Sequence, residues 1–545
     1  MLFTERRKGG DPMKRICKMI AVLLVVVLLF TGCNPAMLRK WVQGILGQSY
    51  VPFSQMEYTR PDMGEFRDQL QVCIQGAGAD TKIDTLMEKV YDFYDIYYRF
   101  QTNYKLANIY YYKDLTDVYW ADEYTYCLEH SSEITAGMDQ LLYALAKSSL
   151  KQQLEAEEYF GAGFFDSYSG ESLWDEAFTA LMEQEMKLQN EYDALSAKAL
   201  EYPYHSDAFY EEIGVKMEEL LVQLVLIRQK IAKQAGYEDY LQFAYDYYYD
   251  RDYTPAQAMA YLDDVRTELS ELYVELPVSA WDAMDETWTE DKMFAYAESM
   301  ANNMGGLIAN AFAVLKEGGY YDITYSPNKY NASYETYLEY YYVPFIFVNP
   351  RGDGSDPLTF VHEFGHFCND YASTGTLCSI DVAEIFSQGM EYLSLYYADG
   401  GEQFEEMVLA NSLSIFVEQA IYSNFEHQLY RMEDPTVEKV RALYLDIAED
   451  YGLGTMSVDS QEYVSIAHLY IAPVYMLSYV LSNDVAMQIY QAEEAESGAG
   501  KQLLENNLAT EAVTLMAFVD AAGLTDPFVE GRVAQLRETF EKVFG

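Results

Sequence analysis

The sequence predicts a mostly helical protein that contains one small β-sheet. Across most of its 545 residues, apolar side chains recur at the spacing of one helix face. β-branched and aromatic runs bounded by proline and asparagine are instead concentrated between residues 320 and 349. The hydrophobic content of 50% is ample for a large core. We therefore expect a large helical body with a short sheet inside it.

The N-terminal part of the chain, residues 33–200, is expected to form a helical region of its own. Helical periodicity predicts three long helices, over 82–100, 132–159 and 172–200. Gly161 and Gly163 interrupt the pattern between the last two. Pro203 then marks the boundary to a second region, residues 201–545.

The second region begins with two further predicted helices. One spans 207–235 and is ended by Gly236, because glycine tolerates the left-handed conformation at a helix C-terminus. The other runs from Thr254 and Pro255 to about residue 276, because threonine before proline is a strong helix start.

The expected sheet lies in the middle of the second region, with strands over Tyr321–Tyr325 and Tyr340–Val348. A loop at Gly352–Pro357 follows, in which Asp356 before Pro357 starts the next helix. A sheet edge beside that helix could hold an extended peptide by main-chain hydrogen bonds, or it could be a covered structural hairpin. Five more helices are predicted after it, over 381–397, 403–432, 437–451, 465–492 and 527–544.

The sequence His-Glu-Phe-Gly-His at 362–366 is the main functional signal. On a helix, His362 and His366 lie one turn apart on the same face and can bind one metal ion. Glu363 can then contact a metal-bound water without being a ligand, the arrangement of a peptidase that attacks with zinc-activated water. The alternative is a chance pair of core histidines, in a chain that has only six histidines.

A catalytic zinc ion needs a third protein ligand, which we expect downstream on a neighbouring helix. The acidic candidates are Asp381, Glu384 and Glu391. Asp381 opens the predicted helix and could serve only as its cap. Glu384 and Glu391 share a face two turns apart. We predict Glu384, which is nearer the loop, as the ligand, and Glu391 as an acceptor that orients a histidine ring.

These residues resemble the thimet oligopeptidase and oligoendopeptidase F family of zinc peptidases, peptidase family M3. The resemblance rests on the motif at 362–366 and on Asp381–Gln388, with Glu391 behind them. In that family the glutamate of the second helix is the third zinc ligand, which implies this role for Glu384. The linker between the two helices, around Ser373–Ser379, is several residues shorter here than is usual there.

The resemblance extends over roughly residue 200 to the C-terminus. The His468–Tyr479 stretch is similar to one in oligoendopeptidase F that supplies a histidine and tyrosines to the active site. Further similar segments are Gly236–Leu241, Ile415–Glu418, Phe425–His427 and Ala522–Pro527. Membership of this family implies a two-lobed helical body with a deep channel that excludes folded proteins by size.

Hydrolysis of a peptide bond builds negative charge on the former carbonyl oxygen, so neutral donors that face the metal accelerate it. His468 and one or both of Tyr475 and Tyr479 fit that role. The two tyrosines are four residues apart, on one helix face. The alternative is that they only pack, in a chain with 52 tyrosines.

The charge of the chain limits its partners. The formal net charge is −51, which argues against binding to nucleic acid, because phosphate contacts need a basic surface. This acidity could attract cationic peptides, or it could only keep a solvated surface soluble.

The N-terminus has the pattern of a bacterial lipoprotein signal, residues 1–32. Lys14, Arg15 and Lys18 precede the apolar run Met19–Phe30, and small residues then precede Cys33. Met13 is a plausible true start. We expect lipid on Cys33 to tether the protein to the outer face of the cytoplasmic membrane. A plain secretory signal or an uncleaved anchor is the alternative.

Four cysteines remain beyond the signal and the lipidated Cys33, and none of the six in the chain forms a Cys-x-x-Cys pair that would suggest a zinc site. In an exported protein, Cys73 could pair with Cys127, or Cys368 with Cys378.

The sequence therefore predicts a zinc metalloendopeptidase that cleaves short oligopeptides. Its zinc ligands would be His362, His366 and Glu384, and Glu363 would be the general base. A related zinc carboxypeptidase or dipeptidyl carboxypeptidase is one alternative, and it would need a fixed cation for the substrate carboxylate. A peptide-binding lipoprotein without activity is the other.

Overall fold

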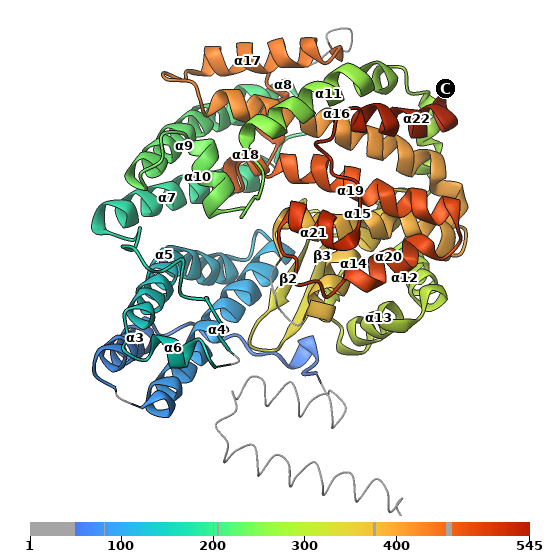
Figure 1. Cartoon of the computed structure of the whole chain (residues 1–545). Helices are drawn as coiled ribbons and strands as arrows, with labels where there is room; N and C mark the ends of the chain where they lie inside the picture. The colour runs from blue at the N-terminus through green and yellow to red at the C-terminus, as the bar shows by residue number, and fades with distance from the viewer. Residues whose placement is uncertain are drawn as a thin grey trace, which may run out of the picture. The chain divides into compact units, whose positions relative to one another are not determined.

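The computed structural model describes residues 50–80, 82–157, 159–199, 201–203, 206–373, 378–453 and 460–545. The predicted signal segment and Cys33 lie outside the described residues, as do positions 374–377 of the predicted linker. The described chain is mostly helical and contains one three-stranded sheet, as predicted (Figure 1). None of its described helices combines the length and apolar character needed to cross a bilayer.

The chain divides into two compact units. The first comprises the described residues up to Asn103 together with Glu133–Trp174, and the second comprises Tyr104–Ser132 and Asp175–Gly545. Two of the three boundaries fall inside long helices, namely α4 (Ile83–Lys113) and α5 (Val118–Ala146). All of the predicted site residues belong to the second unit.

The first unit also contains α3 (Met63–Ala79) and the short α6 (Lys151–Leu154). The helix predicted over 132–159 is wrong at both ends, because α5 starts at Val118 and stops at Ala146. The Asp117 carboxylate accepts the backbone N–H groups of Tyr119 and Trp120 and so caps the new start.

The second unit contains most of the helices. In chain order those before the sheet are α7 (Glu176–Ala199), α8 (Asp207–Phe209), a π-helical turn (Tyr210–Gly214), α9 (Val215–Gln234), α10 (Tyr240–Tyr247), α11 (Pro255–Val274), α12 (Glu290–Met304) and α13 (Gly306–Gly318). Thr254 and Gln257 form a capping box at the start of α11, with Pro255 at its first position, as predicted.

The sheet has the strand order β1-β3-β2. The central strand β3 (Val343–Val348) is buried along its whole length and pairs parallel with β1 (Tyr321–Asp322) and antiparallel with β2 (Ser333–Leu338). We did not predict β2, because its sequence Ser-Tyr-Glu-Thr-Tyr-Leu lacks a continuous apolar run. The strand predicted from Tyr340 begins later, because Tyr342 has φ 54° and belongs to the preceding turn.

The helices after the sheet are α14 (Asp356–Ser373), α15 (Ile380–Tyr397), α16 (Glu405–Leu429), α17 (Val437–Asp450), α18 (His468–Ile471), α19 (Met476–Ala495), α20 (Ala499–Asn507), α21 (Leu515–Ala522) and α22 (Arg532–Phe544). The single helix predicted over 465–492 is wrong. It is broken between α18 and α19, where Pro473 lacks a backbone N–H and Val474 has φ 67°. Neither of the two possible disulfides is present, and Cys73, Cys127, Cys368 and Cys378 are all free thiols.

Candidate metal centre

The His-Glu-Phe-Gly-His residues lie in the middle of α14, which starts directly after the loop that follows β3. The Asp356 carboxylate accepts the backbone N–H groups of Arg351 and Gly352 at 2.8 and 2.7 Å and so folds this loop onto the helix start. The rings of His362 and His366 lie on one face of the helix, with centroids 5.1 Å apart. The local helix therefore places both imidazoles side by side.

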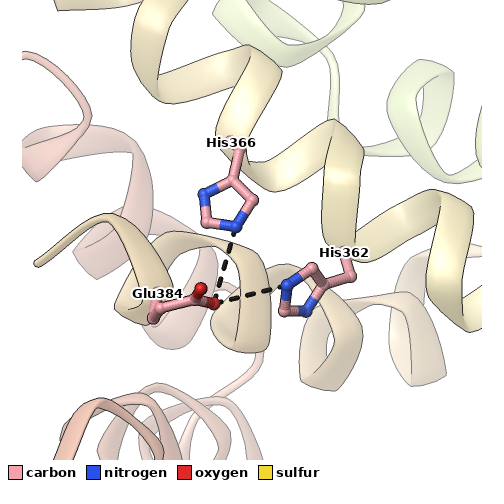
Figure 2. A group of neighbouring side chains, drawn as sticks. All are labelled: His362, His366 and Glu384. Atoms are coloured by element: carbon pink, nitrogen blue, oxygen red, sulfur yellow. Dashed lines mark ion pairs between the residues drawn. The ribbon is translucent and has the colours of Figure 1, made fainter. Parts of the chain in front are cut away.

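Helix α15 packs closely against α14 at Gly365. A Cβ atom at Gly365 would lie 2.5 Å from the Cα of Ser387 and 2.7 Å from the carbonyl oxygen of Phe386. Only glycine permits this approach without displacement of a helix backbone. The approach brings Glu384 of α15 opposite the two histidines (Figure 2).

The three residues that we predicted as ligands come together. One oxygen of Glu384 lies 3.3 Å from His362 Nε2 and 3.5 Å from His366 Nε2. Their candidate ligand atoms all lie within 4.8 Å of one another. Ligands bound tetrahedrally at the usual zinc distances are roughly 3.4 Å apart, so this set of two nitrogens and one oxygen fits such an ion.

Neighbouring side chains orient these ligands. Glu391 Oε1 lies 2.7 Å from His362 Nδ1, so Glu391 orients a ring as its spacing from Glu384 predicted. Glu384 accepts hydrogen bonds from the hydroxyls of Ser387 at 2.9 Å and Tyr475 at 2.7 Å. Burial alone would raise the pKa of Glu384, but the two imidazoles hold it well below its usual range.

Asp381, the other acidic candidate, does not face the histidines. Its carboxylate accepts hydrogen bonds from the hydroxyls of Tyr253, at 2.7 Å, and Ser478. It also lies 3.4 Å from the guanidinium Nε of Arg251. Asp381 therefore connects the first turn of α15 to other elements, and it is neither a ligand in this arrangement nor only a cap.

Glu363 lies in the same cavity as the three candidate ligands. It is 5% exposed, and burial raises its pKa although both imidazoles oppose this shift. Its carboxylate therefore borders the space beside the three candidate ligands.

His468, Tyr475 and Tyr479 form an aromatic cluster beside Glu384. The ring centroids of His468 lie 4.9 Å from Tyr475 and 5.8 Å from Tyr479, and those of the two tyrosines lie 5.2 Å apart. Burial lowers the pKa of His468 to about 4, so its imidazole is neutral at neutral pH. The cluster therefore presents neutral donors, and the hydroxyl of Tyr475 is already bonded to Glu384.

Two cavities adjoin the site. One of about 390 Å³ contains Glu363 and the three candidate ligands, and the other, of about 490 Å³, contains Glu391. They share four lining residues, Ser333, His362, His468 and Tyr479. Strand β2 therefore borders the site, although the sequence did not indicate it. Ser387 was also missed, and its position one turn after Glu384 is the signal that could have identified it.

Comparison with known proteins agrees with this geometry. Residues 192–510 match the model of Peptidase family M3, and residues 53–171 match that of the Peptidase M3 N-terminal domain. A search of curated protein sequences found no match.

Several solved structures share the fold. An X-ray structure provisionally assigned as oligoendopeptidase F has 19% identity and a TM-score of 0.79, covering 90% of this chain and 98% of that chain. PZ peptidase A with an inhibitor has 18% identity and a TM-score of 0.79, with coverages of 90% and 99%. A provisional oligoendopeptidase F from Bacillus anthracis str. Ames has 20% identity and a TM-score of 0.76, with coverages of 90% and 98%. Because the family model spans more than half of its residues, this chain belongs to peptidase family M3.

Proposed function

We propose that the protein is a zinc-dependent endopeptidase of the oligoendopeptidase F type that hydrolyses short oligopeptides. The observation that carries this proposal is the convergence of His362, His366 and Glu384 on one point beside Glu363. These three residues would hold the zinc ion. When bound there, zinc supplies a Lewis acid that polarises the scissile carbonyl group and acidifies water.

Glu363 would move the proton. One of its carboxylate oxygens accepts a proton from the attacking water, and the same oxygen then gives that proton to the nitrogen of the departing amine. Its position next to His362 on α14 keeps it close to the ligands without making it one of them.

His468 and Tyr479 would donate hydrogen bonds to the carbonyl oxygen as it becomes negative. The neutral state of His468 suits this role, because the ring keeps one N–H to donate without carrying a competing charge. Tyr475 would instead orient the ligand Glu384 through its 2.7 Å hydrogen bond.

The two adjoining cavities support endopeptidase action. Cleavage inside a peptide needs space for residues on both sides of the scissile bond, and both cavities border His362. Within the described residues, the edge strand β2 pairs only with β3 and borders both cavities through Ser333. Its other edge could bind an extended peptide by main-chain hydrogen bonds.

A second candidate function has one observation in its favour. The larger cavity is also lined by Arg351, a cation that could hold the C-terminal carboxylate of a substrate. A dipeptidyl carboxypeptidase would use such a residue.

Peptides blocked at both ends test the choice between these functions. We expect the purified protein to cleave internally quenched peptides that carry an acetylated N-terminus and an amidated C-terminus, and to stop when a chelator removes the metal. Glu363→Gln should keep one zinc ion per chain and lose roughly 100- to 10,000-fold in kcat, because only the proton carrier is removed. Normal turnover by this variant would refute the mechanism, and cleavage of peptides with a free C-terminus alone would favour the carboxypeptidase.

We further propose that the protein is exported and anchored by lipid on Cys33. Supporting this is the sequence pattern of basic residues, apolar run and cysteine. Mass spectrometry of the mature N-terminus in the native host measures the modification, and an unmodified Cys33 there would reject the anchor.

A further inference from the structure

The segment between His468 and Tyr475 has an irregular backbone. It leaves α18 after Ile471 and enters α19 at Met476. Between them, Val474 has φ 67°, a conformation that is costly for a β-branched residue. Such a conformation persists only where the surroundings over-determine it, and outliers of this kind cluster at active sites.

Three buried side chains from two distant parts of the chain bind this backbone. Glu426 of α16 accepts the N–H of Val474 at 2.7 Å, and Arg251 donates to the Val474 carbonyl oxygen at 3.0 Å. Tyr249 donates its hydroxyl to the carbonyl oxygen of Pro473 at 2.5 Å. Both peptide groups around the strained residue are therefore held by side chains.

Arg228 of α9 holds the end of α18 in the same way. It donates to the carbonyl oxygens of Leu469, at 2.9 Å, and Tyr470. Glu185 fixes the guanidinium through an ion pair of 2.6 Å. These carbonyls lack helical partners because α18 has only one turn.

We propose that these four side chains position the catalytic donors, and we call them the clamp: Arg228, Tyr249, Arg251 and Glu426. The inference rests on the proposed function, since it assumes that His468 and Tyr479 act on the substrate. The clamp residues are positioning residues, because they act on the reaction through the backbone and side chains that they bind.

The clamp also connects the donors to the metal ligands. Arg251 donates to the hydroxyl of Ser478 at 2.9 Å and lies 3.4 Å from the carboxylate of Asp381, one turn before Glu384. Tyr475, at the end of the clamped segment, bonds to Glu384 itself. A shift of this segment would therefore move the donors relative to the ligands.

The clamp is poorly explained by stability alone. Glu426 is 1% exposed, and its second carboxylate oxygen is buried without a hydrogen-bond partner. Burial raises the pKa of this glutamate to about 7, although Arg228 and Arg251 oppose the shift. An acid in so unfavourable a place is expected where it has a function beyond holding the fold together.

Substitution of Glu426 tests the inference in the full-length, zinc-loaded enzyme. Glu426→Ala removes the acceptor for Val474, and we expect kcat to fall by about 10- to 100-fold with little change in KM or zinc content. Glu426→Gln keeps an acceptor oxygen of the same geometry and should recover most of kcat. A general loss of stability would not produce this split between kcat and KM or this recovery.

Glu493→Ala is the matched control. Glu493 is also buried, and it accepts the N–H of Gly498 at 2.7 Å, at a turn with φ 89° that carries no site residue. We expect this variant to unfold at a lower temperature while its kcat stays at the wild-type value.

A second pair of variants decides the question if Glu426→Ala does not fold. Tyr249→Phe removes one hydroxyl and should lower kcat by about 3- to 10-fold. Tyr451→Phe also removes a buried hydroxyl, bonded to the carbonyl oxygen of Leu262 at 3.0 Å, and should leave kcat unchanged.

The outcomes distinguish a failure of the clamp inference from a failure of the proposed function. An active wild-type enzyme whose kcat survives both Glu426→Ala and Tyr249→Phe would overturn the clamp alone. Equal loss of kcat in Glu426→Ala and Glu426→Gln would also overturn it, because the bond to Val474 would then not be the cause. A wild-type enzyme that cleaves no peptide would refute the proposed function and the clamp together.

Discussion

The helix pair α14–α15 and the segment 468–479 both contribute to one site, but they are held in place differently. His362 and His366 are neighbours because they are one helical turn apart, and Glu384 meets them through a single helix–helix contact at Gly365. The donor segment instead depends on the clamp, whose members lie between 48 and 242 residues away in sequence from the backbone groups that they bind.

This difference affects how the two parts of the site tolerate amino-acid substitution. We call the helix pair α14–α15 the ligand half and the segment 468–479 the donor half. A regular helix supplies its own backbone hydrogen bonds, so the ligand half needs only close packing. An irregular backbone must find its partners elsewhere, so the donor half needs several buried polar residues at once. Substitutions of the candidate ligands should therefore change metal binding, and those of the clamp residues should change turnover.

Removal of the third ligand should have the largest effect. Glu384→Ala deletes the carboxylate between the two imidazoles, so we expect zinc content to fall far below one ion per chain and activity to be lost with it. Metal analysis after dialysis measures this. Unchanged zinc occupancy would move the third ligand elsewhere, with Glu391 as the next candidate.

Substitutions of Tyr479 and Tyr475 should affect different properties of the enzyme, turnover for Tyr479 and zinc binding for Tyr475. Tyr479→Phe removes a proposed donor to the substrate and should lower kcat by about 100- to 1,000-fold at full zinc content. Tyr475→Phe removes the hydrogen bond to Glu384 and should weaken zinc binding more than it lowers kcat of the zinc-saturated enzyme. Kinetics at saturating zinc together with zinc titration compare them. Identical behaviour of the two variants would erase the distinction between ligand-orienting and substrate-facing tyrosines.

Substitution of Gly365 tests the packing of α14 against α15 directly. Gly365→Ala would place a methyl group against the backbone of Ser387 and Phe386, which must move apart, so we expect zinc affinity to fall by roughly 10- to 100-fold. Gly78→Ala is a control on α3, where a Cβ atom meets no other atom within 4 Å. Competition with a chelator measures both affinities, and equal affinities would show that α15 can shift without moving Glu384.

The smallest effect concerns the pH dependence of stability. The pKa of Glu426 is raised from 4.5 to about 7 in the folded protein, so the folded state binds more protons between these values. The stability contributed by the neutral acid is present below pH 4.5 and is lost as pH rises through 7. Relative to Glu426→Gln, the wild type should therefore lose about 3 kcal/mol of unfolding free energy across this range.

Denaturant unfolding at a series of pH values measures this difference. The other titratable groups around Glu426 keep their charge states between pH 4.5 and 8. Burial raises the pKa of Tyr249 and Tyr430, so both stay neutral. Burial lowers the pKa of Arg228 and Arg251, but their neighbours raise it further, so both stay charged. Parallel stability profiles for the wild type and Glu426→Gln would show that Glu426 does not titrate in this window.

Much of the fold followed from local patterns. Regular amphipathic periodicity predicted the bounds of α11, α15 and α17 closely, because the residues that start and end these helices lie next to them in the sequence. Two of the errors lie where long-range contacts decide, whereas the start of α5 at Val118 is set by a local cap that the helical periodicity did not reveal. Strand β2 depends on pairing with the buried β3, and the break before α19 depends on the clamp.

The sequence by itself determined that His362 and His366 share one helix face beside Glu363, since their spacing on one helix is a local property. Only the tertiary structure decided that Tyr475 bonds to Glu384, that Asp381 turns away towards Arg251, and that Glu426 supports the donor segment. The physical reason is that a helix satisfies its own backbone, whereas an irregular segment takes its shape from partners that are distant in the chain.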